Sequence, residues 1–229
     1  MKKKSIVKKL SVFICLISSI CMFTACGGPE KPEVTITLDG KAIGLEETLQ
    51  SSLDRGLIMT DVNGEEAENT LVFGAMEVRY DSVHLGTEAT PHRSEITVML
   101  YNDTQSMSTA AGSKVMTLNY DLTSDSSDQA PVLFNDIDFW GMTQDEAVAA
   151  LAEKGFGVDS DKVNNEYHFL VFSGKNDVTV TIDFDLGSEF EKAGGTAPQK
   201  TVLEFDPNTY YVSGLKASIS GKLNIDFGN

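Results

Sequence analysis

The sequence predicts an α+β fold of two tandem small units, each a short helix packed on an antiparallel β-sheet. Several segments alternate apolar and polar residues with a period of two, as half-buried strands do. Two other segments space their apolar residues as one face of a helix, begin near acidic residues and end at a glycine. Each helical segment is followed by about three or four strand segments, so the second half of the chain repeats the plan of the first.

Residues 1–25 form a separate leader. Five lysines are followed by an apolar run from Leu10 to Phe23, which is shorter than the roughly 20 residues that a membrane-spanning helix needs. The leader ends in Phe23-Thr24-Ala25, directly before Cys26. This arrangement resembles the signal peptides of bacterial lipoproteins, in which small residues precede a cysteine that receives a diacylglyceryl group before the signal is removed.

The resemblance implies that Cys26 is lipidated and holds the mature chain on the outer face of a membrane. Two acyl chains on one residue anchor stably where a single chain is marginal. The alternative is an ordinary secretory signal whose cleavage site happens to adjoin a cysteine. Residues 26–33 contain glycines and prolines and predict an extended tether.

The first unit covers residues 34–123. Its first strand is expected at 34–38, because apolar residues alternate with threonines there, and Asp39-Gly40 signals a turn. A helix is predicted over 46–55, with three leucines four positions apart and Gly56 as its C-terminal cap. Further strands are expected at 71–80, 95–101 and 114–122.

Residues 124–129 are polar and predict a linker, which places a domain boundary before the second unit at 130–229. A second helix begins after Thr143, because Thr143 and Glu146 form a capping box, and it ends at Gly155. The apolar stretch 132–140 precedes this helix, and strands are expected at 166–173, 178–186, 201–205 and 215–227. A simpler alternative to two diverged copies is that any α+β chain of this size shows two such stretches.

The stretch Phe139-Trp140-Gly141-Met142-Thr143-Gln144-Asp145-Glu146-Ala147 resembles the start of the repeat in the β-lactamase-inhibitor and outer-membrane-assembly lipoprotein superfamily. The first half keeps only Gly44-Leu45 and the acidic residues of this pattern. The resemblance implies a helix packed on an antiparallel sheet and the binding of other proteins through a sheet face. It brings no catalytic residues.

Composition excludes several functions. The leader holds five of the 18 basic residues and none of the 34 acidic ones, so the mature chain keeps 13 basic residues and a net charge of −21. Such a surface repels phosphate backbones, which argues against nucleic acid as a partner. Cys15 and Cys21 lie in the leader, so the mature chain has Cys26 alone and no internal disulfide. The missing disulfide, the acidic balance and the lysine-rich leader favour a Gram-positive source.

Metal-binding and catalytic patterns are not found. The histidines, His84, His92 and His168, lack the spacing of a zinc site, and His168 is expected on the solvent side or rim of a strand. Two sets of aspartates lack the spacing of a calcium loop and are interpreted as solvated surface. The first set is Asp121, Asp125 and Asp128, and the second is Asp159 and Asp161. We therefore expect no metal, no cofactor and no enzymatic activity.

Two further pairs have open interpretations. Asp183 and Asp185 share the polar face of one strand. They are either a pair of carboxylates with a chemical role or simply solvated residues that keep this strand face polar. Phe139 and Trp140, the latter the only tryptophan, directly precede the second helix. An exposed ring there would stack on a sugar or anchor a partner protein, whereas the alternative is core packing as part of a helix staple.

These observations predict a non-enzymatic, membrane-anchored extracytoplasmic lipoprotein that binds an envelope or extracellular protein at the cell surface. Its distinguishing feature would be a contiguous apolar or aromatic patch on an exposed sheet face. The alternative is a lipoprotein that captures a small solute or a glycan in a pocket of several hundred cubic ångströms.

Overall fold

The fold is known from a computed structural model that describes residues 30–66, 72–93, 95–123, 131–163, 168–189 and 206–219. Residues Lys31–Asn229 form one compact unit. The leader, Cys26, the expected linker at 124–129, the expected strand at 201–205 and residues 220–227 lie outside the described residues.

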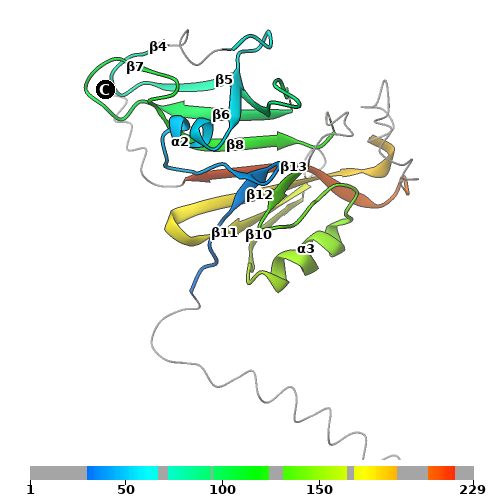
Figure 1. Cartoon of the computed structure of the whole chain (residues 1–229). Coiled ribbons are helices and arrows are strands. Elements are labelled where there is room, and N and C mark those ends of the chain that lie inside the picture. Colours follow the sequence, from blue (N-terminus) through cyan, green and yellow to red (C-terminus); the bar gives the residue numbers. More distant parts are fainter. Residues whose placement is uncertain are drawn as a thin grey trace, which may run out of the picture. The chain divides into compact units, whose positions relative to one another are not determined.

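Eight antiparallel strands form one sheet in the order β10-β11-β12-β13-β8-β6-β5-β3 (Figure 1). The strands are β3 (Leu57–Thr60), β5 (Val78–Thr87), β6 (Ile96–Tyr101), β8 (Lys114–Asp121), β10 (Val158–Val163), β11 (His168–Ser173), β12 (Val178–Leu186) and β13 (Tyr210–Ile219). The secondary structure of the described residues is mostly β-strand, so the prediction holds only in a coarser form, a large antiparallel sheet with few helices. The sequence pattern predicted one sheet for each half, whereas β8 of the first half pairs with β13 of the second, with Asn119 opposite Lys216. The pairing of β8 with β13 forms hydrogen bonds between backbone N–H and C=O groups that would be unpaired at the edges of two separate sheets.

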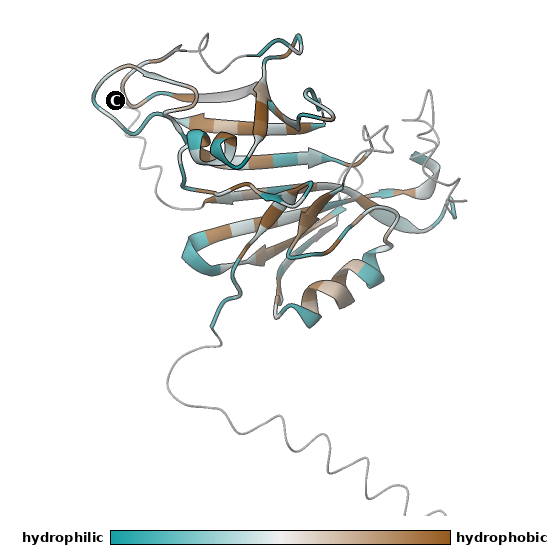
Figure 2. Cartoon of the chain, viewed as in Figure 1, coloured by the Kyte–Doolittle hydropathy of each residue, from teal (hydrophilic) through white to brown (hydrophobic). Residues whose placement is uncertain are grey.

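A second layer packs on one face of this sheet, which we call the inner face; the opposite face is the outer face. It contains α2 (Leu49–Asp54), α3 (Gln144–Glu153) and a small sheet of β2 (Lys41–Ala42), β1 (Ile36–Leu38) and β9 (Val132–Phe134). One hydrophobic core includes residues of both layers and both halves, such as Leu49, Leu118, Phe134, Leu151 and Leu215. Figure 2 shows the alternation of apolar and polar residues along the strands that produces this buried face.

The remaining short elements lie in the connections between strands of the large sheet. They are β4 (Val72–Phe73), β7 (Ser108–Thr109), which pairs with β4, and the 3-10 turn η1 (Lys175–Asp177). The end of the expected tether is held by the fold, since the carbonyl of Pro32 accepts a hydrogen bond from the backbone N–H of Lys175 at 2.7 Å.

The two helices begin differently. At α3 the predicted capping box is present, because Thr143 caps the N–H of Glu146 and the Glu146 carboxylate accepts from the Thr143 N–H at 2.9 Å. The other helix, α2, is shorter than predicted. Glu46 has a positive φ of 64°, and the carbonyl of Glu47 accepts from the N–H of Val115 in β8, so this backbone pairs with a strand instead of starting the helix.

The edge strands β3 and β10 were not predicted. Each follows its helix directly, and β10 carries the exposed acids Asp159 and Asp161, which interrupt the apolar alternation. Charged residues on an edge strand discourage pairing with other chains, which explains why this strand lacks a clear hydrophobic pattern.

The strand order is mirrored about the β8–β13 pair, as β3-β5-β6-β8 on one side and β13-β12-β11-β10 on the other. In the second layer β1 and β9 take the same place before their helices and pair with each other. In both halves a two-residue turn with positive φ follows this strand, at Asp39-Gly40 and at Asn135-Asp136. An isolated bridge lies at each helix N-cap, between Thr48 and Lys114 in the first half and between Thr143 and Tyr211 in the second. A glycine with positive φ follows each helix, at Gly56 and at Gly155. The halves therefore share a local plan that includes more than strand order.

Candidate functional site

The outer face of the eight-stranded sheet carries rows of mostly short polar side chains. One row of paired residues crosses all eight strands, and it runs Thr60, His84, Thr97, Asn119, Lys216, Thr181, Val171, Ser160. At the β3 and β5 end this face is covered, because His92 lies against His84 with ring centroids 5.1 Å apart and bonds Thr60. On β6, β8, β13, β12 and β11 the row is partly or fully exposed. We call this exposed part, on those five strands, the open face.

A hollow lies in the open face where Gly214 of β13 stands between Asp121 of β8 and Asp183 of β12. Its volume is about 270 Å³. A Cβ atom at position 214 would come within 3.2 Å of the Asp183 carboxylate, so the glycine leaves this space open. Its lining also includes Asp185, Ser213 and Lys216, and we call it the Gly214 hollow.

The carboxylates of this hollow are held in an unfavourable environment. Although Asp183 is exposed as a residue, loss of solvent around its carboxyl group raises its pKa, the neighbouring Asp185 raises it further, and Lys216 partly opposes the rise. Burial likewise raises the pKa of Asp185, against a hydrogen bond from Ser213 that lowers it. In the described part of the chain neither Asp183 nor Asp185 takes part in a salt bridge.

The third acid of the hollow is tied to its own strand end. Asp121 accepts hydrogen bonds from the backbone N–H and the hydroxyl of Thr123, at 2.9 Å and 2.6 Å. Its carboxylate also contributes to the raised pKa of Asp185. The hollow therefore concentrates negative charge on one side of the open face.

The mirrored position in the first half is built differently. There Met99 of β6 is opposite Thr117 of β8, where the second half has Asp183 opposite Gly214. Both pairs lie beside a register shift with one extra residue, Met116 in β8 and Ser213 in β13. The same backbone bulge thus supports a methionine and a threonine in one half and an acidic hollow in the other.

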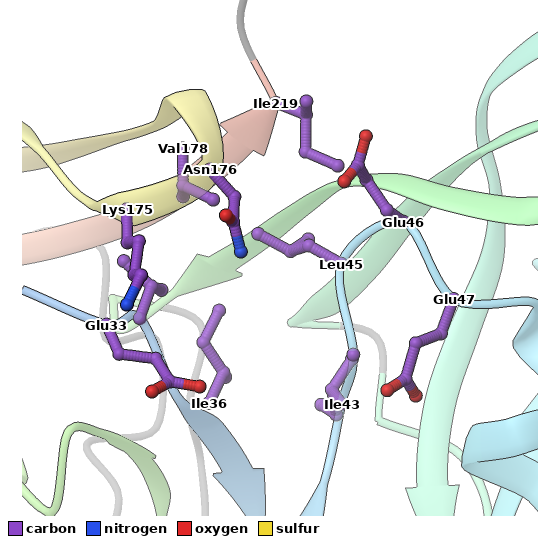
Figure 3. Close-up of a pocket in the computed structure, with 12 residues that line it drawn as sticks. Glu33, Ile36, Ile43, Leu45, Glu46, Glu47, Lys175, Asn176, Val178 and Ile219 are labelled. Carbon is purple, nitrogen blue, oxygen red and sulfur yellow. The ribbon is translucent and has the colours of Figure 1, made fainter.

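A second hollow of about 220 Å³ lies between the segment that contains β1 and β2, the turn η1 and the ends of β12 and β13 (Figure 3). Ile36, Ile43, Val178 and Ile219 line its apolar part, and the labelled charged groups are Glu33, Glu46, Glu47 and Lys175. Gly44 leaves room for the Glu47 side chain, which bonds Arg55 at 2.6 Å. Both hollows are smaller than the roughly 300–1,000 Å³ of typical small-molecule sites.

The aromatic pair predicted as a binding site is largely part of the core. Phe139 is only 2% exposed, and its ring stacks on Phe134 with centroids 6.1 Å apart, as the core-packing alternative predicts. Trp140 is half-buried and packs against the same core. Phe139 therefore offers no surface to a ligand.

The expectation that His168 lies on the solvent side or rim is wrong. The side chain is buried, with its ring against Tyr210 at 4.6 Å and Phe184 at 5.2 Å. The reason is strand register, because His168 shares the inner face of β11 with Leu170 and Phe172.

The acids weighed as calcium ligands are dispersed. Asp121 lies in the Gly214 hollow, Asp159 and Asp161 are exposed on β10, and Asp125 and Asp128 lie outside the described residues. Within the described ranges, no group of three or more histidine, cysteine or acidic side chains is arranged to hold a metal ion.

The expected apolar patch is also not what the described surface presents. Its large exposed apolar side chains are Val62, Met76, Met107 and Val158, none of them on the open face. Sequence reasoning placed Asp183 and Asp185 on one polar strand face but did not find Asp121, Gly214 and Ser213 beside them. Only strand pairing brings these residues together.

None of the described helices is long and apolar enough to cross a membrane. Comparison of the chain with protein-family models, curated proteins and solved structures found no match.

Proposed function

We propose that the protein is a lipid-anchored extracytoplasmic lipoprotein that binds another envelope or extracellular protein through its open face, without enzymatic activity. The observation that carries the proposal is the Gly214 hollow. Two partly desolvated carboxylates with raised pKa values lie there beside a glycine, and acids with perturbed pKa values in a hollow are typical of functional sites.

The shallow relief of the open face, whose hollow has a volume of only about 270 Å³, favours a protein over a small solute. Its rows consist mostly of short side chains on adjacent antiparallel strands, with Lys216 as an exception, and short side chains allow a second surface to approach closely. A solute or glycan receptor would need a deeper cavity than either hollow offers.

We further propose that the two halves are diverged copies of one small α+β unit. The mirrored strand order, the pairing of β1 with β9 and of β8 with β13, and the shared bulge support this origin. Duplication explains how one copy can change its outer face while the other retains the shared backbone plan.

The anchor is tested by expressing the chain with its leader beside the Cys26→Ser variant. We expect the wild-type chain to carry an added diacylglyceryl mass and to partition into detergent, and the variant to be released. Equal behaviour of the two chains would refute lipidation of Cys26.

The binding face is tested by photo-crosslinking on intact cells. A photoreactive residue replaces Thr181 at the centre of the open face or, as a control, Asp145 on the exposed side of α3. We expect a discrete adduct with an envelope or extracellular protein from position 181 alone. Equal adducts from both positions, or none from position 181, would argue against the open face.

A further inference from the structure

The Gly214 hollow differs from the rest of the open face in charge and in depth. Around it the face presents mostly threonine, serine and asparagine, which are small neutral hydrogen-bonding groups, together with the exposed Lys216, the one cation among the residues that line the hollow. At the hollow the side chain is absent at position 214, and carboxylates approach from both neighbouring strands. A partner that lies flat on the face can therefore insert one longer side chain at this point.

The first half provides an internal comparison for this feature. With the same bulge and the same strand pairing, Met99 and Thr117 occupy the positions of Asp183 and Gly214. The fold therefore does not require a glycine or an acid there. The acidic hollow is a property of the second half that the shared backbone does not explain.

Charge complementarity identifies the occupant. Asp183 and Asp185 have no salt-bridge partner in the described part of the chain, and their partial burial strengthens their attraction for a cation. The mature chain carries a net charge of −21, which repels acidic partners and steers basic ones toward the surface.

We propose that the open face docks a basic protein, and that a lysine or arginine side chain of this partner enters the Gly214 hollow between Asp183 and Asp185. The inference rests on the proposed function, because it specifies the chemistry of the partner that the open face binds. The cationic group lies beside the two carboxylates, while the neutral threonine, serine and asparagine side chains of the rows contact the backbone around it.

The probe for the test is a random 12-residue peptide library selected on the mature chain, and binding of recovered peptides is measured by fluorescence anisotropy. We expect lysine or arginine to be enriched, and replacement of that residue by glutamine to weaken binding. The Asp183→Asn/Asp185→Asn variant is expected to lose about tenfold or more in affinity. The matched control Glu153→Gln/Asp159→Asn removes the same charge from exposed surface elsewhere and should bind as the wild type does.

A second variant fills the hollow and removes only one of its carboxylates. Asp183→Met/Gly214→Thr gives the second half the residues of the first, which the same backbone already accommodates, and it should also abolish the preference for basic peptides. Circular dichroism verifies that each variant is folded.

The outcomes separate the inference from the proposed function. Thr181→Trp places a large ring at the centre of the open face and blocks docking whatever the partner's charge. If peptides bind wild type and fail on Thr181→Trp, yet bind both hollow variants unchanged, the cationic hollow is wrong and the docking face stands. If Thr181→Trp has no effect either, or no peptide is recovered, both are overturned.

Discussion

The continuous sheet predicts that the two halves unfold together, and the Leu85→Ala substitution tests this. Leu85 lies on β5 in the first half, is fully buried, and pairs with Met59 of β3. Truncating a fully buried leucine removes its transfer free energy and leaves a cavity, at a cost of about 3 kcal/mol in the free energy of unfolding. In a chain of this size 1 kcal/mol lowers the melting temperature by about 2–4 °C, so the expected decrease is about 6–12 °C.

The assay uses the single tryptophan as a reporter for the other half. Circular dichroism follows the strands of both halves, whereas Trp140 fluorescence follows only the second. Because β8–β13 and β1–β9 join the halves and one core spans both, we expect the two signals to shift together in one transition.

Met107→Ala is the control, since Met107 is in the same half and 77% exposed, and it should leave the melting temperature unchanged. The reasoning is refuted if Leu85→Ala leaves the Trp140 transition at the wild-type temperature while circular dichroism separates into two steps. That result would mean that the halves are independent domains, as the sequence pattern alone suggested.

Two further predictions follow from local contacts. Thr143→Ala removes a capping box and should lower the free energy of unfolding in urea by about 1 kcal/mol. Thr48→Ala should lower it by less, because the Thr48 side chain makes no capping hydrogen bond. Equal losses in the two variants would contradict the capping argument. Asp183→Asn should stabilise the chain at pH 7 and lose this advantage at pH 3. The raised pKa of Asp183 means that the wild type loses stability as pH rises through it, so an equal gain at both pH values in urea midpoints would exclude this cause.

Local patterns were sufficient wherever neighbouring residues in the chain decide the conformation. The capping box at Thr143 and the alternating strand at Val178–Leu186 were predicted with their bounds or close to them. The turn signal at Asp39-Gly40 was also predicted, and both of its residues have positive φ. These features depend on hydrogen bonds and side-chain periodicity within a few residues.

The candidate site depended on contacts between distant strands. The sequence placed Asp183 and Asp185 on one polar face, but Asp121 and Gly214 reach them only because β8, β13 and β12 pair in a particular register. Alternation shows which residues share a face and does not identify the neighbouring strand.

By itself, the sequence determined the type of the main elements, the acidic balance of the chain and the pattern that predicts an anchor at Cys26. Only the tertiary structure decided that the halves form one sheet, that Phe139 and His168 are buried, and that the acids gather at Gly214. The physical reason is that periodicity and capping act over a few residues, whereas strand pairing and core packing join residues up to about a hundred positions apart.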